Sequence, residues 1–92
     1  MQIEQRPSFQ RAMKKLQANQ LNDLNHAITM VVENPTIGQL KTGDLRGLRT
    51  YKFRMVKQLT LLGYTWDKDV VILTLLAFGP HENFYRDLKN QL

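Results

Sequence analysis

The sequence predicts an α+β protein in which an N-terminal helical hairpin packs on a small antiparallel sheet of three to four strands, followed by a C-terminal helix. Apolar residues recur at helical spacing through the first third of the chain. From Leu48 to Phe78 they alternate with polar residues or form short runs separated by short turns. Strands joined by short turns are antiparallel neighbours, and the apolar face of such a sheet needs a helical layer to cover it.

Length and composition restrict the protein to one domain, which spans residues 1–92. The chain has 42% apolar and 23% charged residues, as is ordinary for a globular protein, and it has no cysteine for disulfides or thiolate metal sites. The first residues lack the apolar core of a signal peptide, and the longest apolar run, Val70–Leu76, is too short to span a bilayer. We therefore expect a cytoplasmic protein without a membrane segment, a cofactor or a metal ion.

The N-terminal third predicts a short strand and two helices. Residues 1–5 alternate weakly in polarity and predict the strand. Pro7 begins the first helix, because the fixed φ of proline suits the first helical turn. A second helix follows Asn19 and ends at Asn34-Pro35, since the residue before a proline leaves the helical region. The apolar stripes of the two helices are Phe9, Met13 and Leu16 in the first and Leu21, Leu24, Ile28 and Val31 in the second.

The segment after the helices predicts a loop and a half-buried strand. Residues 36–47 contain three glycines and form the loop. Residues 48–55 alternate between polar and apolar side chains, which is typical of a strand with one buried face. Thr50, Lys52 and Arg54 share the polar face of this strand, so two cations lie side by side on one surface of the sheet.

Two further strands and a helix complete the predicted domain. Residues 58–66 are rich in leucine, threonine and aromatic residues, residues 70–78 are nearly all apolar, and residues 67–69 form the turn between them. Gly79 and Pro80 open the last helix, since glycine can cap a helix and proline is favoured at its first position. The buried stripe of this helix consists of Phe84, Leu88 and Leu92.

The positive charge of the chain is concentrated in residues 41–57. This segment holds six basic residues and one acidic residue, so it carries +5, which equals the formal net charge of the whole chain. Charge of one sign on one element attracts polyanions, and nucleic acid is the commonest polyanion in a cell. The alternative is a solvated basic strand edge, in which lysine prevents aggregation. The six basic residues are Lys41, Arg46, Arg49, Lys52, Arg54 and Lys57.

His81 and Tyr85 are the best candidates for chemistry. They are four residues apart, so they project from one side of the predicted last helix, and His81 lies in its first turn, where phosphate binds well. With Lys52 and Arg54 on the adjoining sheet surface, the set supplies a general base, a stacking group and a phosphate clamp. RNA cleavage by attack of a 2′-hydroxyl on its neighbouring phosphate needs these three roles. The alternative is that His81 only faces solvent and Tyr85 only packs against the sheet.

Other polar features carry weaker signals. His26 falls on the polar side of the second helix and is expected to be solvated. Two histidines without matching carboxylate spacing do not predict a metal site. The glycines of residues 36–47 do not form a phosphate-binding loop, because no Gly-Lys-Ser or Gly-Lys-Thr follows them.

Three stretches, in their order and spacing, resemble the RelE/ParE superfamily of toxins from bacterial type II toxin–antitoxin pairs. They are NPTIGQLKTGDLRGL from Asn34 to Leu48, the basic strand RTYKFR that follows it, and the ending GPHENFYRDLK. In the family a loop with proline and glycine runs into a basic strand. The ending is similar to that of the YafQ-type branch, where a histidine opens the C-terminal segment and an aromatic residue follows four positions later. The resemblance covers nearly the whole chain.

The resemblance implies a RelE-like fold and a cytosolic toxin held inactive by an acidic antitoxin that is encoded beside it. Many relatives are endoribonucleases that cut messenger RNA in the ribosomal A site. By position, His81 would be the general acid or base, Tyr85 the C-terminal aromatic, and Lys52 and Arg54 the groups that stabilise the phosphorane-like charge. The residues expected to bind nucleic acid are Lys41, Arg46, Arg49, Lys57 and Arg86.

The chain departs from the family at one position. Many relatives carry an arginine in the second of the three late strands, in a run similar to Arg-Leu-Leu-Tyr, whereas this chain has Thr60-Leu61-Leu62-Gly63. Either Arg54 or Lys57 replaces that arginine, or the nuclease site is missing. The second option implies a relative of the ParE branch, which poisons DNA gyrase and has no nuclease activity. A third alternative, outside the family, is a small RNA-binding domain that uses the basic surface.

Overall fold

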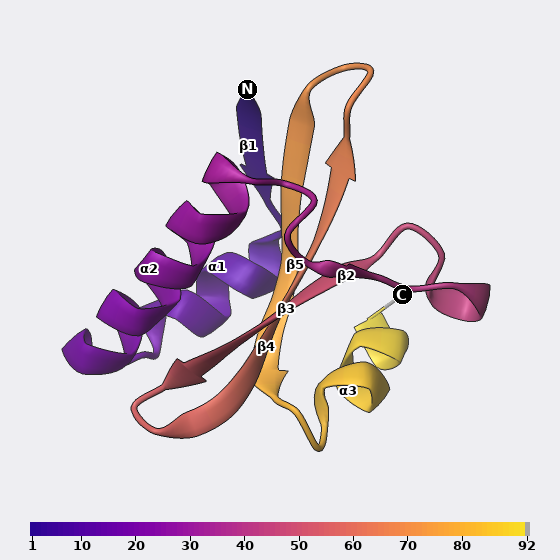
Figure 1. Ribbon diagram of the computed structural model, residues 1–92. Coiled ribbons are helices and arrows are strands. Elements are labelled where there is room, and N and C mark those ends of the chain that lie inside the picture. The colour runs from indigo at the N-terminus through magenta and orange to yellow at the C-terminus, as the bar shows by residue number, and fades with distance from the viewer. Residues whose placement is uncertain (92) are drawn as a thin grey trace.

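The computed structural model describes residues 1–91 and has the α+β architecture that the sequence predicts (Figure 1). None of the helices in this described part is long and apolar enough to cross a membrane. The elements are β1 (Gln2–Gln5), α1 (Pro7–Lys14), α2 (Ala18–Glu33), β2 (Gln39–Leu40), the 3₁₀ turn η1 (Gly43–Leu45), β3 (Arg49–Met55), β4 (Gln58–Asp67), β5 (Ile72–Pro80) and α3 (Phe84–Gln91).

The sheet has five strands in the order β1-β5-β4-β3-β2. The predicted antiparallel pairing of β3, β4 and β5 is confirmed. The sheet is nevertheless mixed and slightly larger than expected, because β1 pairs in parallel with β5 and the two-residue β2 pairs with β3. The strand predicted over residues 1–5 is present as β1. Local residue patterns do not reveal its partner, because the pairing joins segments about 70 residues apart, and β2 is too short to show alternation.

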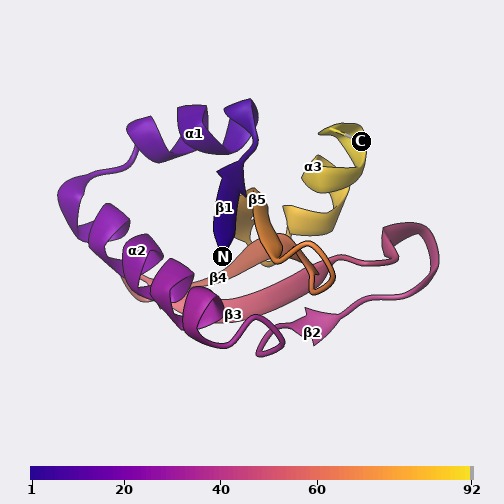
Figure 2. The ribbon, with the colours of Figure 1, turned by 90° about the horizontal axis from the view of Figure 1, so that it is seen from above.

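One face of the sheet is covered by α1 and α2, and we call it the hairpin face (Figures 1 and 2). Helix α2 buries Leu24, Ala27 and Val31, which recur at the spacing of one helical side. Helix α1 buries Phe9, whose ring meets Phe78 of β5 edge-to-face with 5.3 Å between centroids. The strand side chains in this core are Tyr51, Phe53, Met55, Leu62, Tyr64, Trp66, Leu73, Leu75 and Phe78.

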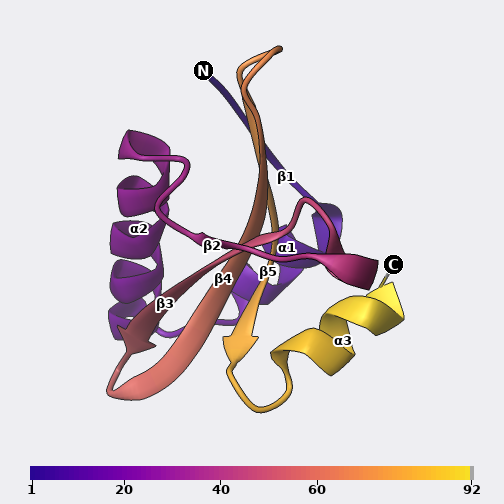
Figure 3. The ribbon, with the colours of Figure 1, turned by 45° about the vertical axis from the view of Figure 1, so that its right-hand side comes forward.

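Helix α3 packs on the opposite face, which we call the α3 face (Figure 3). Its side chains Phe84 and Leu88 are buried against Leu48, Leu61 and Leu76, as predicted. Leu92, the third residue of the predicted stripe, lies outside the described residues. The close approach depends on a glycine in β4, because a Cβ atom at position 63 would lie 2.6 Å from Cζ of Phe84. Helix α3 therefore packs over Gly63, where the absence of a side chain leaves room for the Phe84 ring.

The last helix begins later than the sequence suggests. Instead of opening the helix, Gly79 and Pro80 continue β5, paired in register with Leu61 and Thr60 of β4. On its other side β5 pairs with β1 only over residues 72–75. Pro80 lies beyond this pairing, so its missing N–H group removes no hydrogen bond to β1. His81 consequently lies in a turn ahead of α3, and the prediction that it occupies the first helical turn is wrong.

Candidate functional site

Lys52 and Arg54 lie exposed on the α3 face, as the alternation of β3 predicts. Their register partners on β4 are Leu61 and Leu59. Leu61 is buried under α3, whereas Leu59 is 40% exposed beyond the start of that helix. The cationic part of β3 therefore borders the uncovered end of the sheet.

His81 reaches the same end of the sheet from β5. Its backbone N–H donates to the carbonyl of Leu59 at 3.4 Å, and Leu59 is the residue paired with Arg54. Because neighbouring strands are about 4.8 Å apart, the backbones of His81 and Arg54 lie on either side of Leu59, about 10 Å from each other. His81 and Leu59 also line one open hollow of about 270 Å³, together with Gln58, Pro80 and Glu82.

Tyr85 does not pair with His81, because only Tyr85 belongs to α3. Its partly buried ring meets Phe84 edge-to-face at 5.2 Å and lies 5.3 Å from the ammonium nitrogen of Lys41. That nitrogen also donates to the side chain of Gln39 at 3.0 Å. The phenol and Lys41 thus form a separate cation–π pair beside α3.

The remaining cations are spread over several places. Arg49 lies on the side of β3 opposite to Lys52, and its guanidinium donates to the carbonyls of Gly38 at 3.0 Å and Thr36 at 3.4 Å. Lys57 lies in the β3–β4 turn, where its carbonyl accepts a hydrogen bond from Arg54. Arg86 of α3 donates to the side chain of Asn83 at 3.2 Å. The structure brings Lys52, Arg54 and Lys57 to the end of the sheet near His81, and it does not bring Arg49 there.

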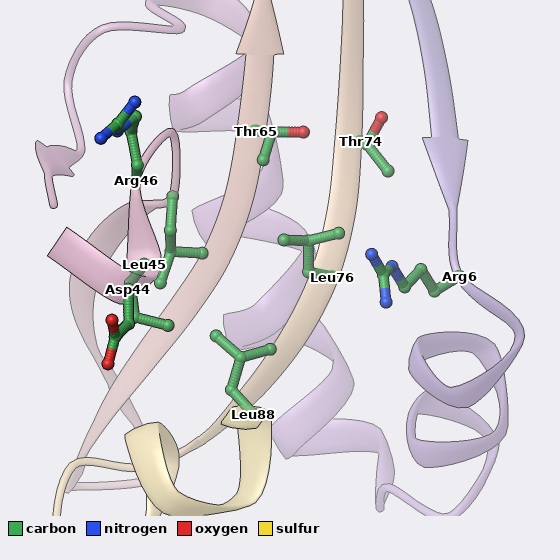
Figure 4. A pocket seen from close by; sticks show the side chains of 9 residues that line it. Arg6, Asp44, Leu45, Arg46, Thr65, Thr74, Leu76 and Leu88 are labelled. Atoms are coloured by element: carbon green, nitrogen blue, oxygen red, sulfur yellow. The ribbon is translucent and has the colours of Figure 1, made fainter. Parts of the chain in front are cut away.

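A second hollow, of about 380 Å³, lies on the α3 face near the C-terminal part of α3 (Figure 4). Arg6 enters it from the β1–α1 junction, where its backbone N–H donates to the carbonyl of Leu75 at 3.1 Å. Figure 4 shows its guanidinium extending toward Leu76. A guanidinium beside leucine side chains can bind an anionic group that is carried on an aliphatic chain. Sequence reasoning missed Arg6, since only the tertiary fold brings it here. The other lining residues are Asp44, Leu45, Arg46, Leu48, Thr65, Thr74 and Leu88.

Burial affects the titration of the Tyr64 side chain. It is fully buried on the hairpin face, where its hydroxyl donates to the carbonyl of Pro35 at 2.8 Å and accepts from the N–H of Gly38 at 2.9 Å. Burial raises the pKa of the Tyr64 phenol above its usual value of 10.0, while the Gly38 N–H and the charge of Arg49 act in the opposite direction. The two hydrogen bonds of the Tyr64 hydroxyl therefore hold the loop after α2 against the sheet. The phenol stays protonated at neutral pH.

The histidines of the described chain are not arranged to bind a metal. His26 is exposed on α2, as expected, and His81 lies at the far end of β5. Among the side chains that the structure describes, no group of three or more histidine, aspartate or glutamate residues is placed to hold a metal ion.

Solved structures of RelE toxins share the fold of this chain. The isolated E. coli RelE toxin aligns with a TM-score of 0.69 over 99% of this chain and 98% of its own, at 18% identity. A chain of the intact E. coli RelBE toxin–antitoxin complex gives 0.70 over 86% and 94%, also at 18% identity. The archaeal RelE–RelB complex from Pyrococcus horikoshii OT3 gives 0.60 over 86% and 92%, at 15% identity. At these identities the likeness establishes the fold.

The family is established by the sequence itself. No curated protein matches the chain closely enough to count as a relative. The family model of the ParE-like toxins of type II bacterial toxin–antitoxin systems, however, matches residues 3–89, which is nearly the whole chain. The resemblance predicted from the three sequence stretches is thereby confirmed. The protein belongs to the ParE-like toxin family of type II toxin–antitoxin systems.

Proposed function

We propose that this toxin is a ribosome-dependent endoribonuclease that cuts messenger RNA without a metal ion. The observation that carries the proposal is the placement of His81 and Arg54 on either side of Leu59, at the uncovered end of the α3 face. A titratable imidazole and a permanent cation at this spacing can both reach one phosphodiester. The exposed end of the sheet leaves room for the RNA.

In this mechanism His81 accepts the proton of the 2′-hydroxyl as the 2′-oxygen attacks the adjacent phosphorus. The bond from phosphorus to the 5′-oxygen breaks, and the leaving oxygen takes up a proton from water, which yields a 2′,3′-cyclic phosphate and a 5′-hydroxyl. Lys52 and Arg54 stabilise the negative charge that develops on the phosphorane oxygens. Arg54 is the stronger candidate for bidentate contact with the phosphate, because its guanidinium presents paired donors.

We assign Tyr85 a role in holding the RNA. Its ring lies within 5.3 Å of the Lys41 ammonium, so a base stacked on the phenol would have a cation beside it for a phosphate. Arg46, Lys57 and Arg86 extend the positive surface toward ribosomal RNA. Arg49 contributes by fixing the loop after α2, since its guanidinium already binds two backbone carbonyls.

The test is cleavage of a reporter messenger RNA by the purified toxin on programmed ribosomes. His81→Ala and Lys52→Ala are each expected to lower the cleavage rate by about 10²–10³, the usual effect of removing one group that stabilises the transition state. His26→Ala and Lys68→Ala are matched controls, because they remove the same side chains from exposed positions on α2 and in the β4–β5 turn, outside the proposed site. Full cleavage by both His81→Ala and Lys52→Ala would remove these residues from the site.

The ParE-like alternative is inhibition of DNA gyrase without nuclease activity. It is favoured by Thr60, which stands where many RelE relatives have arginine: its side chain is only 3% exposed and donates to the carbonyl of Gln58 at 3.0 Å. The two activities separate in cells that express the toxin. Growth arrest that persists in His81→Ala, with a DNA-damage response and continued translation, would support the gyrase target.

We also propose that an acidic antitoxin neutralises the toxin in the cytoplasm. RelE toxins have been solved with RelB antitoxins, including one with a RelB peptide. In the hollow lined by Arg6 and Arg46, the two guanidinium groups can bind acidic side chains of the antitoxin. The leucines of the same hollow can contact its aliphatic side chains. Binding of the protein encoded by the adjacent reading frame should weaken as salt increases, and more steeply for wild type than for Arg6→Gln. A complex indifferent to salt would indicate a mainly apolar interface.

A further inference from the structure

We infer that Asp23 of α2 is a positioning residue for the candidate active site, because it fixes the β3–β4 turn that in turn orients Arg54. The inference rests on the proposed nuclease function and adds a residue from the opposite side of the sheet. Asp23 belongs to the helical hairpin, whereas Arg54 and His81 lie at the end of the α3 face. Figures 1 and 3 show the β3–β4 turn and the end of β5 at the same end of the sheet, at the bottom of both views.

The β3–β4 turn does not specify its own shape. Met55 pairs with Gln58, which leaves Val56 and Lys57 as a two-residue loop with φ angles of +48° and +73°. Such loops are usually built from asparagine and glycine, which tolerate positive φ. A β-branched valine is a clear outlier in this region. The conformation must therefore be supported by a contact from outside the hairpin.

Asp23 supplies that contact. Its Oδ2 atom accepts a hydrogen bond from the backbone N–H of Val56 at 2.8 Å, across 33 residues of sequence. A bond between a carboxylate and a backbone N–H is stronger than a neutral one. The Asp23 carboxylate also satisfies the N–H group of Val56, which lies in the loop beyond the Met55–Gln58 pair and so has no partner in the strand ladder.

The turn passes this constraint on to Arg54. The carbonyl of Lys57 accepts a hydrogen bond from Nη1 of Arg54 at 3.1 Å. Arg54 is paired with Leu59, whose carbonyl binds the N–H of His81. If the turn relaxes, the Lys57 carbonyl moves and the guanidinium loses its anchor, although its charge remains. The loss should therefore appear in kcat and leave KM nearly unchanged.

The experiment compares four variants in the ribosome-dependent cleavage assay. Asp23→Ala is expected to lower kcat by about ten- to a hundredfold, as a displaced catalytic group does. Asp23→Asn keeps an oxygen acceptor and should lose less than Asp23→Ala. Asp23→Ala with Val56→Asn should recover most of the activity, because asparagine favours the positive φ that Asp23 otherwise enforces. Asp23→Ala in an Arg54→Ala background should cause no further loss.

Asp67→Ala is the matched control. Asp67 caps the β4–β5 turn at the opposite end of the sheet, where its Oδ1 accepts from Asp69 N at 3.0 Å and from Val70 N at 3.4 Å. The Asp67→Ala substitution removes an aspartate that binds backbone N–H groups of a turn, as Asp23→Ala does. An unchanged kcat in Asp67→Ala would therefore exclude a general effect of losing such an aspartate. Loss in Asp23→Ala that Val56→Asn does not restore, or that adds to Arg54→Ala, overturns the inference.

A second readout separates this inference from the proposed function. The NMR signals of the Arg54 guanidinium should shift in Asp23→Ala and return toward their wild-type positions when Val56→Asn is added. If wild type does not cleave RNA, the nuclease proposal fails by itself. If wild type cleaves but the Arg54 signals do not respond to Asp23→Ala, the positioning role fails and the nuclease proposal stands.

Discussion

The two faces of the sheet are built for different purposes. The hairpin face is filled by Phe9, Leu24 and Val31, each at most 1% exposed. The α3 face is covered by an eight-residue helix whose described side chains include the buried Phe84 and Leu88, and it leaves two hollows and most of the cations of β3 open. Stability therefore resides mainly on the hairpin face, and the α3 face is free to carry charge.

Strand β3 divides these tasks between its two sides, and its arginines provide the largest expected effect. Arg54→Ala should lower RNA cleavage by about 10²–10³ and leave the unfolding temperature nearly unchanged, because Arg54 is exposed and stabilises reaction charge. Arg49→Ala should do the reverse. It removes the donor to the carbonyls of Gly38 and Thr36, so it lowers stability and leaves cleavage per folded molecule unchanged.

Thermal unfolding and single-turnover cleavage of the same two variants measure this division. Equal losses of activity in Arg49→Ala and Arg54→Ala, with both proteins folded, would mean that the two faces are not functionally distinct. The two variants differ only in the side of β3 from which an arginine is removed, so a loss of cleavage confined to Arg54→Ala would support the proposed function.

Much of the fold could be predicted because periodicity is a local property. The alternation of β3 correctly placed Lys52 and Arg54 on one face, and the spacing of Leu24 and Val31 correctly marked the buried side of α2. The parallel pairing of β1 with β5 could not be predicted, because nothing in Gln2–Gln5 records its partner. The late start of α3 was missed because Gly79-Pro80 is a strong helix signal that the ladder to β4 overrides.

The candidate site was only partly predictable for the same reason. The sequence placed His81 near the basic strand but attached it to Tyr85 through a helix that begins at Phe84. Arg49 was grouped with the other cations by charge, although its alternation phase puts it on the hairpin face. Asp23 and Arg6 gave no signal, because each acts through a contact between segments far apart in the chain.

Two glycines provide the next largest effect, one on each face. Gly38→Ala puts a Cβ atom 2.6 Å from the Tyr64 hydroxyl and 3.1 Å from the Thr50 carbonyl, which are held in place. Gly63→Ala meets Phe84 at 2.6 Å, at the start of a short terminal helix that can move away. Overpacking typically costs about 1–3 kcal/mol, and we expect Gly38→Ala to approach the upper value and Gly63→Ala the lower.

Denaturant unfolding together with amide exchange in α3 distinguishes the two outcomes. Gly63→Ala should raise exchange in α3 selectively, whereas Gly38→Ala should destabilise the whole domain. Gly79→Ala is the control, since a Cβ atom there meets nothing within 4 Å. A larger global loss in Gly63→Ala than in Gly38→Ala would show that α3 is as integral to the core as the helical hairpin.

Tyr64→Phe should have a smaller effect on the hairpin face. The hydroxyl satisfies the N–H of Gly38 and the carbonyl of Pro35, so its removal leaves both backbone groups without their partner. We expect a loss of about 1–2 kcal/mol in the free energy of unfolding. Cleavage by the folded variant should not change, because Tyr64 is on the opposite side of the sheet from His81. Reduced cleavage at full folding would show that the loop after α2 communicates with the site.

The pH dependence of this difference is the smallest expected effect. Burial raises the folded-state pKa of Tyr64 above 10.0, so at pH values between 10.0 and that raised pKa the unfolded chain releases the phenolic proton and the folded chain keeps it. The stabilisation is therefore complete below pH 10 and is lost as pH rises through the folded pKa. Unfolding measured from pH 8 to 11 should show the gap between wild type and Tyr64→Phe closing, since every other titrating group is common to both. A widening gap would mean that the folded protein favours the phenolate, with the Gly38 N–H and Arg49 outweighing burial.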